Sequence, residues 1–206
     1  MTRRSDWPAD RTQVAEAGTG NGGDSALSRA GAESPRSPRD PVERARAICL
    51  RLLTGAPRTR EQLAEALRKR EVPEEAATQV LDRLEGAGLI DDAAFAGAWV
   101  ESRHHGRGLA RRALSRELRA KGVDSSVVEQ AVSRLDTDQE ERTARALVDR
   151  RLRATRGLDR EKRLRRLAGM LARKGYPEGM ALRVVRQALE EEGEDPEMLE
   201  RYLPEV

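Results

Sequence analysis

The chain has 206 residues, of which 37% are hydrophobic, 2% aromatic and 36% charged. Ordinary globular domains contain about 45–50% apolar residues, so any core must be thin and aliphatic, which argues against one large globule. One cysteine excludes an internal disulfide, and with two adjacent histidines it offers no zinc-site spacing, so we expect no metal or other cofactor. No stretch approaches the roughly 18 apolar residues of a membrane-spanning helix, and the N-terminus lacks the apolar run of a secretory signal, which predicts a cytoplasmic protein.

The formal net charge of +3 conceals an uneven distribution of charge along the chain. Residues 103–174 carry a net charge of +11, whereas residues 187–206 carry a net charge of −7. The basic block should attract polyanions or an acidic protein surface, and the acidic end should repel nucleic acid. A solvated helix surface without a partner accounts for the same charges equally well.

The N-terminal segment differs in composition from the rest of the chain. Residues 1–40 are rich in Gly, Pro, Ser and Thr and poor in large aliphatic residues, which predicts a disordered N-terminal segment. From Pro41 onward apolar residues recur three or four positions apart, and no segment alternates as a strand does. The folded part is therefore expected to be all-α.

An internal repeat organises the folded part. Three segments align without gaps: LAEALRKREVPEEAATQVLDRL from Leu63, LSRELRAKGVDSSVVEQAVSRL from Leu114 and LAGMLARKGYPEGMALRVVRQA from Leu167. Each reads as a helix, a tight turn and a second helix, and a further apolar-periodic run precedes each pair. This pattern predicts an elongated, curved array of three tandem three-helix repeats. The expected ranges are 41–90, 91–137 and 138–190, followed by an acidic extension over 191–206.

The turns and caps of these helices can also be predicted. Gly122 and Gly175 stand where a helix ends in a left-handed residue, but Glu71 occupies that position in the first repeat. A non-glycine residue in this conformation costs roughly 1–2 kcal/mol, so we expect a turn of different shape at Glu71. Thr59 and Gln62 have the spacing of a capping box.

No catalytic constellation is recognisable, so we expect a protein that is not an enzyme. His104 and His105 lie in the sequence SRHHGRG and are interpreted as solvated loop residues. Cys49 is expected to be a small buried hydrophobic residue. Phe95 and Trp99, four residues apart, are expected to be core residues and not base-stacking platforms.

The centre of the chain resembles the RecX family of recombination regulators. The resemblance rests on DDAAFAGAWVESR from Asp91, Gly108, LSRELRAKGVD from Leu114 and the returning KGYP at Lys174, and it extends over about residues 41–190. The family is known for three tandem three-helix repeats that bind the RecA recombinase filament and restrain its DNA strand exchange and ATP hydrolysis. The resemblance therefore implies a regulator of homologous recombination, DNA repair and the SOS response, which binds RecA filaments and the single-stranded DNA within or beside them. We also expect the chain to be a monomer.

Arginines of the basic block are the expected contacts to this partner. Arg112, Arg116 and Arg119 share one helical stripe, and arginine suits bidentate pairing with carboxylates or phosphates, although codon bias would also enrich it. We expect a basic groove across the second and third repeats. The candidate contacts are Arg103, Arg107, Arg111, Arg112, Arg116, Arg119, Lys121, Arg150, Arg151, Arg163 and Arg166.

Two other functions compete with this interpretation. The stretch from Arg60 to Ile90 resembles the reading helices of winged-helix transcription regulators, although a winged helix should continue with a β-hairpin, whereas the chain from Asp91 reads as helix. The third candidate is a helical adaptor that uses its basic face to bind an acidic protein without any DNA.

Overall fold

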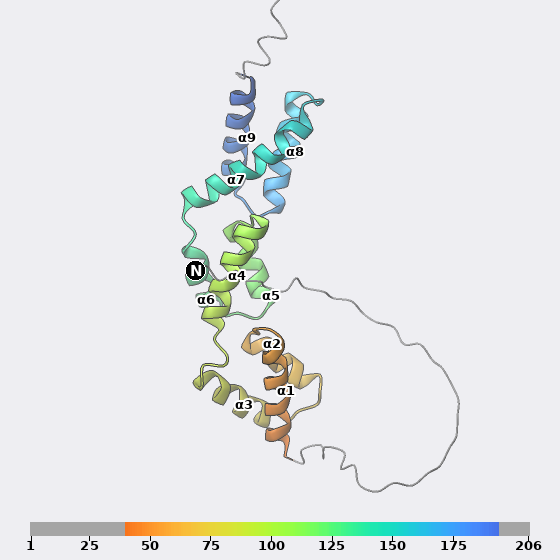
Figure 1. Ribbon diagram of the computed structural model, residues 1–206, viewed down its shortest axis with the longest axis vertical. Helices are drawn as coiled ribbons and strands as arrows, with labels where there is room; N and C mark the ends of the chain where they lie inside the picture. The colour runs from red at the N-terminus through yellow and green to blue at the C-terminus, as the bar shows by residue number, and fades with distance from the viewer. Residues whose placement is uncertain (1–39, 194–206) are drawn as a thin grey trace, which may run out of the picture. The chain divides into compact units, whose positions relative to one another are not determined.

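The structure is a computed structural model that describes residues 40–193 (Figure 1). Residues 1–39 of the predicted tail and residues 194–206 of the predicted extension lie outside this range. Between residues 40 and 193 the chain forms nine α-helices and one short 3-10 helix, with no β-strand. The predicted all-α class is confirmed.

The helices group into three consecutive sets of three, which confirms the predicted tandem repeats. The first repeat contains α1 (Pro41–Gly55), α2 (Arg60–Arg68) and α3 (Glu74–Gly86). The second contains α4 (Asp92–Arg107), α5 (Arg111–Ala120) and α6 (Ser125–Ser133). The third contains α7 (Thr137–Leu152), the 3-10 helix η1 (Arg153–Thr155), α8 (Arg160–Arg173) and α9 (Glu178–Gly193).

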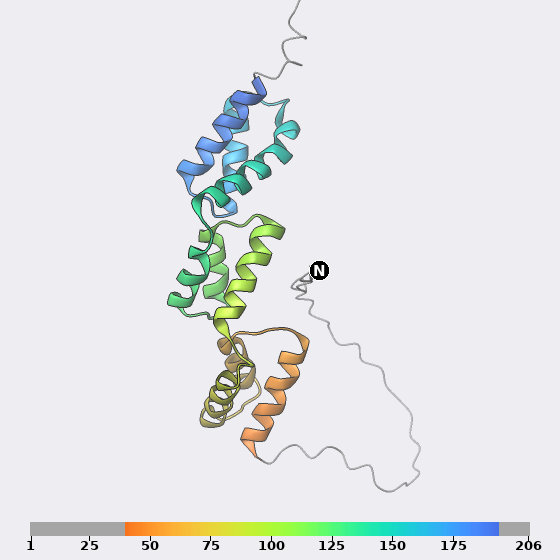
Figure 2. The ribbon, with the colours of Figure 1, turned by 60° about the vertical axis from the view of Figure 1, so that its left-hand side comes forward.

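The described chain divides into two compact units. The first unit comprises residues up to 57 together with 63–89, in which α1 packs on α3. The second comprises 58–62 and the chain from Ile90, and so holds the second and third repeats. Within it α4 packs on α5 and α6, while α7, α8 and α9 lie side by side (Figure 2).

Aspartate begins the first helix of every repeat. The carboxylates of Asp40, Asp91 and Asp136 each accept a hydrogen bond from a backbone N–H in the first turn that follows. These N–H groups have no partner inside the helix, so an aspartate at the N-cap stabilises the helix start by about 1 kcal/mol. The capping box predicted before α2 is also confirmed, because Thr59 and Gln62 exchange reciprocal hydrogen bonds of 3.2 Å.

The turn between the second and third helices has one geometry in all three repeats. Glu71, Gly122 and Gly175 have φ angles of 55°, 78° and 90°. In each turn this residue donates its backbone N–H to the carbonyl three residues earlier, and the next residue donates to the carbonyl five residues earlier. The expectation of a different turn shape at Glu71 was therefore wrong, because the hydrogen bonds and the buried Val72 that follows hold the glutamate in the left-handed conformation.

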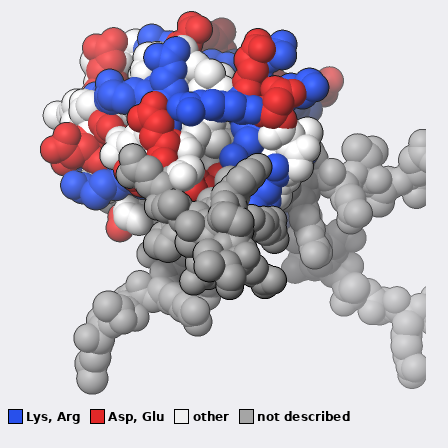
Figure 3. All heavy atoms as spheres, turned by 90° about the horizontal axis from the view of Figure 1, so that it is seen from above, with Lys and Arg blue, Asp and Glu red and all other residues white. Residues whose placement is uncertain are grey.

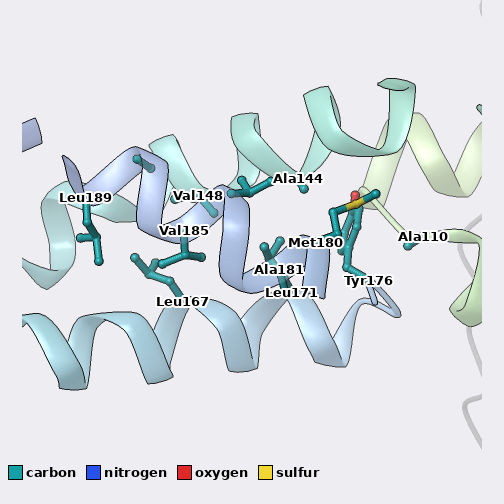
Figure 4. Packing of buried hydrophobic residues seen from close by; sticks show 12 residues of the cluster. Ala110, Ala144, Val148, Leu167, Leu171, Tyr176, Met180, Ala181, Val185 and Leu189 are labelled. Atoms are coloured by element: carbon teal, nitrogen blue, oxygen red, sulfur yellow. The ribbon is translucent and has the colours of Figure 1, made fainter. Parts of the chain in front are cut away.

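The core is built from the leucine pairs that the repeat predicted. One pair per second helix is buried to an exposed fraction of 1% or less, and these residues are Leu63, Leu67, Leu114, Leu118, Leu167 and Leu171. Figure 4 shows the last pair packed against residues of α7 and α9. Cys49 is fully buried, and Phe95 and Trp99 are stacked core residues with ring centroids 5.8 Å apart, as predicted.

The interpretation of the histidines as loop residues was wrong. Helix α4 continues through His104 and His105 and ends at Gly108, which takes the left-handed φ of 61°. His104 is buried; its Nδ1 lies 2.9 Å from the Leu109 carbonyl oxygen and its Nε2 lies 3.0 Å from Thr143 Oγ1. The helix therefore passes through Gly106 and ends at Gly108.

The second and third repeats are joined by close backbone packing. Ala110 donates its N–H to the Lys174 carbonyl at 2.9 Å, and the Tyr176 hydroxyl donates to the Gly108 carbonyl at 3.1 Å. A Cβ atom on Gly175 would lie 2.5 Å from the Ala113 nitrogen, so only glycine allows this approach. These contacts fix the start of α5 against the end of α8 and so position the surface between the two helices.

Two basic grooves flanking helix α8

A groove of about 840 Å³ runs between α5 and α8, and we call it the α5–α8 groove. Its floor is largely apolar because Leu164, Ala168 and Ala172 of α8 and Ala181 and Leu182 of α9 face it. Arginines stand along its sides, and these are Arg112, Arg116 and Arg119 from α5 and Arg165 from α8. Ser115, Gly169, Gly175, Tyr176 and Glu178 complete the lining.

The three α5 arginines are exposed and have no ion-pair partner among residues 40–193. Helical spacing explains their alignment, since residues three and four apart share one face. Arg165 pairs with Glu161 in its own helix at 3.6 Å, and Glu178 is the one carboxylate in the lining. The groove therefore offers three guanidinium groups beside an apolar floor.

A second groove, of about 430 Å³, lies on the other side of α8, and we call it the α7–α8 groove. It is lined by Leu147, Arg150, Arg151, Ala154, Thr155, Arg166, Leu167, Met170, Arg173 and Lys174. Five of these ten residues are basic and none is acidic. Arg150, Arg151, Arg166 and Arg173 make no ion pair within the described part of the chain.

The local charge in the α7–α8 groove perturbs Lys174. Burial lowers the pKa of its ammonium group, and the positive charges of Arg107 and Arg151 lower it further. The Lys174 ammonium also donates a hydrogen bond to the Arg107 carbonyl. Excess positive charge is thus concentrated in this groove, where an anion would relieve the repulsion.

Several predicted contact residues already interact with other side chains of the same chain. The Arg111 Nε lies 2.7 Å from Oε2 of the buried Glu140. Arg103 is buried with its Nε 3.9 Å from Glu117 and its guanidinium 4.1 Å from the centre of the Trp99 ring.

The remaining predicted residues have mixed surroundings. Arg163 pairs with Glu192 and bonds to Thr155, and the Lys121 ammonium lies 4.2 Å from the centre of the Trp99 ring. Arg107 is exposed at the end of α4 near Lys174. The structure thus gathers six of the predicted residues into the two grooves: Arg112, Arg116 and Arg119 in one, Arg150, Arg151 and Arg166 in the other.

Arg165, Arg173 and Lys174 also line the grooves but were not among the predicted contacts. Arg166 and Arg173 are seven positions apart in α8, so helical periodicity places them on one face. Lys174 gave no such signal, because its position follows from the turn that ends α8 against Ala110.

Acidic residues neutralise the end of the third repeat. Arg156 and Arg163 both pair with Glu192, and Arg160 lies 3.4 Å from Glu190. Burial raises the pKa of the Glu192 carboxyl, but the hydrogen bonds from the two arginines leave its pKa below the ordinary value. Figure 3 shows basic and acidic side chains intermixed on the face seen from above.

Three sequence models of one family match the chain. They are described as the first, second and third three-helix domains of RecX, and they match residues 45–84, 91–132 and 138–185. The chain belongs to the RecX family. The match to the second domain covers the Asp91 segment on which the resemblance rested.

Named relatives agree with this assignment. A protein named regulatory protein RecX from Streptomyces coelicolor is 76% identical over 179 residues, covering 87% of this chain and 94% of the relative. Its namesake from Thermobifida fusca is 62% identical over 157 residues, covering 76% of this chain and 85% of the relative. These RecX relatives are named as regulators, in line with the expected regulatory role.

The fold is that of solved RecX structures. The crystal structure of RecX from Lactobacillus salivarius aligns with a TM-score of 0.67 at 16% identity, over 71% of this chain and 96% of that one. A second RecX crystal structure aligns with a TM-score of 0.63 at 24% identity, over 68% of this chain and 70% of that one. Among the described helices, none has the length and apolar character needed to cross a membrane.

Proposed function

We propose that this chain binds the RecA filament in the cytoplasm and restrains its DNA strand exchange and ATP hydrolysis, using the two grooves that flank α8. Membership of the RecX family supports the partner. The observation that carries the proposed contact surface is the gathering of six exposed arginines into these grooves without carboxylate partners in the described chain. Cations placed in this way attract acidic protein surfaces and DNA phosphates with little dependence on base sequence.

The proposed surface is narrower than the basic block as a whole. Arg103, Arg111 and Arg163 already pair with carboxylates of the same chain. Binding a partner through these arginines would break those ion pairs. The free arginines of α5, α7 and α8 bear no such cost. We therefore assign the main contacts to Arg112, Arg116, Arg119, Arg150, Arg151 and Arg166.

The test is inhibition of the single-stranded-DNA-dependent ATPase of the host's RecA, titrated with this protein at two salt concentrations. The variant R112E/R116E/R119E should raise the half-inhibitory concentration at least tenfold, a change of about 1.4 kcal/mol in binding. Its helical circular dichroism should stay unchanged, because the three side chains are exposed. Higher salt should weaken inhibition by the native chain.

The matched control is R51E/R70E/R83E, which changes the charge equally at three exposed positions of the first repeat that form no ion pair within residues 40–193. This variant should stay within about twofold of the native chain. Full inhibition by R112E/R116E/R119E would refute the groove assignment. Absence of any effect on RecA, together with tight binding to one duplex sequence, would favour the winged-helix regulator instead.

A further inference from the structure

The α5–α8 groove differs in chemistry from the α7–α8 groove. It combines three unpaired arginines with an apolar floor that includes the half-buried Leu164 and Leu182. A phosphate backbone would pair with the arginines but would leave that floor in contact with water. A peptide that carries both carboxylates and large apolar side chains satisfies both parts of the groove.

The chain itself contains such a segment at residues 194–206, with the sequence EDPEMLERYLPEV. It carries five carboxylates and one arginine, which makes it complementary in charge to the α5 arginines. Met198, Leu199, Tyr202 and Leu203 lie between these charges and match the apolar floor in kind. Its net charge of −4 also sets it apart from the basic block.

The described chain ends close to the groove. Arg160 and Arg163, in the first turn of α8, pair with Glu190 and Glu192 at the end of α9, so Gly193 lies beside that turn. The groove begins at the next α8 residue, Leu164. From there to Ala172 the helix rises about 12 Å, whereas thirteen residues can span up to about 43 Å.

We propose that residues 194–206 bind in the α5–α8 groove of the same chain. The carboxylates pair with Arg112, Arg116 and Arg119, and the apolar side chains cover the floor. A short tether gives the segment an effective concentration in the millimolar range, so even weak intrinsic affinity keeps the groove occupied. If the groove also contacts the RecA filament, which rests on the proposed function, the segment competes with that partner and lowers the apparent affinity.

Disulfide trapping in the full chain tests the proposal without RecA. The variant A172C/L203C places one thiol in the groove and one in the segment, and A154C/L203C is the matched control. Ala154 is exposed in η1, two residues from Arg156, which pairs with Glu192, so it is at least as near to the start of the segment but lies in the other groove. The native Cys49 can remain, because it is fully buried and burial raises the pKa of its thiol.

We expect A172C/L203C to form an intrachain disulfide under mild oxidation at least ten times faster than A154C/L203C. Adding R112E/R116E/R119E should reduce the faster rate to that of the control. Equal rates for the two pairs, or a fast rate that survives the charge reversal, would overturn the proposal. Disulfide-linked dimers in place of the intrachain bridge would assign the segment to a second copy and overturn it as well.

A RecA assay then separates this proposal from the proposed function. Neutralising the segment with E194Q/D195N/E197Q/E200Q/E205Q should slow trapping of A172C/L203C at least fivefold and lower the half-inhibitory concentration against RecA at least threefold. Trapping that responds to both charge changes, in a protein that never inhibits RecA, would refute the proposed function and leave the intrachain contact established. Trapping that ignores the neutralisation would refute the contact.

Discussion

At the scale of single residues, Glu71 shows how a repeat keeps its geometry without its usual amino acid. Its φ of 55° matches the glycines at 122 and 175, although a side chain makes this conformation unfavourable by roughly 1–2 kcal/mol. The hydrogen bonds of the turn and the burial of Val72 offset that cost. The first repeat thus carries local strain that the other two avoid.

Replacing Glu71 should therefore stabilise the first unit. We expect E71G to raise its free energy of unfolding by about 1 kcal/mol, since glycine tolerates the left-handed region. Hydrogen exchange of the amides in α1 and α3 measures this change. The exposed Gln79, in the interior of α3, is the control, and Q79G should lower the same free energy by about 0.5–1 kcal/mol. A loss of protection in E71G would show that the glutamate side chain stabilises the turn.

The surroundings of individual side chains could be predicted only in part from the sequence. Helical spacing was enough to place Arg112, Arg116 and Arg119 in one row, because that row depends on one helix alone. The surroundings of Arg103 depend on how α4 packs against α5, because its carboxylate neighbour Glu117 comes from α5. His104 was misjudged for a similar reason, since its partner Thr143 comes from α7.

At the scale of elements, α5 begins without a capping side chain of its own. Ala110 occupies the N-cap position, is fully buried and donates its N–H to the Lys174 carbonyl at the end of α8. The carboxylate of Glu140, from the first turn of α7, accepts the Arg111 N–H at 2.8 Å and so replaces the missing cap. Asp92 in α4 accepts the Arg60 N–H at the start of α2 at 2.9 Å, so one device recurs at two helix starts.

Removing this cap should be costly. We expect E140A to lower the free energy of unfolding by about 2–3 kcal/mol, because it leaves the Arg111 N–H and guanidinium without their buried acceptor. Urea denaturation followed by circular dichroism measures the change, and E140Q should show a smaller loss because its amide oxygen can still accept. The neighbouring Glu141 pairs with Arg183 at the surface, so E141A should cost less than about 1 kcal/mol. Equal losses for E140A and E141A would contradict the capping role.

The helices and repeats were the features that the sequence predicted best. Apolar periodicity and the aligned leucine pairs located all three repeats, because each helix buries one stripe regardless of its neighbours. The interpretation of His104 and His105 as loop residues ended this helix too early, because the sequence SRHHGRG contains two glycines, Gly106 and Gly108, at which a helix can stop. Only the left-handed φ of Gly108 and the buried contacts of His104 decide between them.

In the molecule as a whole, the arginines of the basic block fall into two groups, those that form ion pairs within the chain and those that do not. Near Glu190 and Glu192 the arginines are neutralised by the chain itself, whereas the two grooves keep six unpaired arginines from the predicted set. The sequence revealed the excess of positive charge over 103–174. It could not show which arginines were free, because pairs such as Arg156 with Glu192 join residues 36 positions apart.

The difference between the two grooves predicts how the affinity for bare single-stranded DNA depends on salt concentration. Each neutralised phosphate contributes about −0.7 to the slope of log K against log salt. R150E/R151E/R166E should therefore reduce the slope by about 2 units, because the α7–α8 groove presents cations without a carboxylate. R112E/R116E/R119E makes the same change in charge but should reduce it by less than about 1, since an apolar floor favours a peptide over a phosphate backbone. Equal reductions in fluorescence-anisotropy titrations would mean that the arginines act as one diffuse field and that the two grooves are not distinct sites.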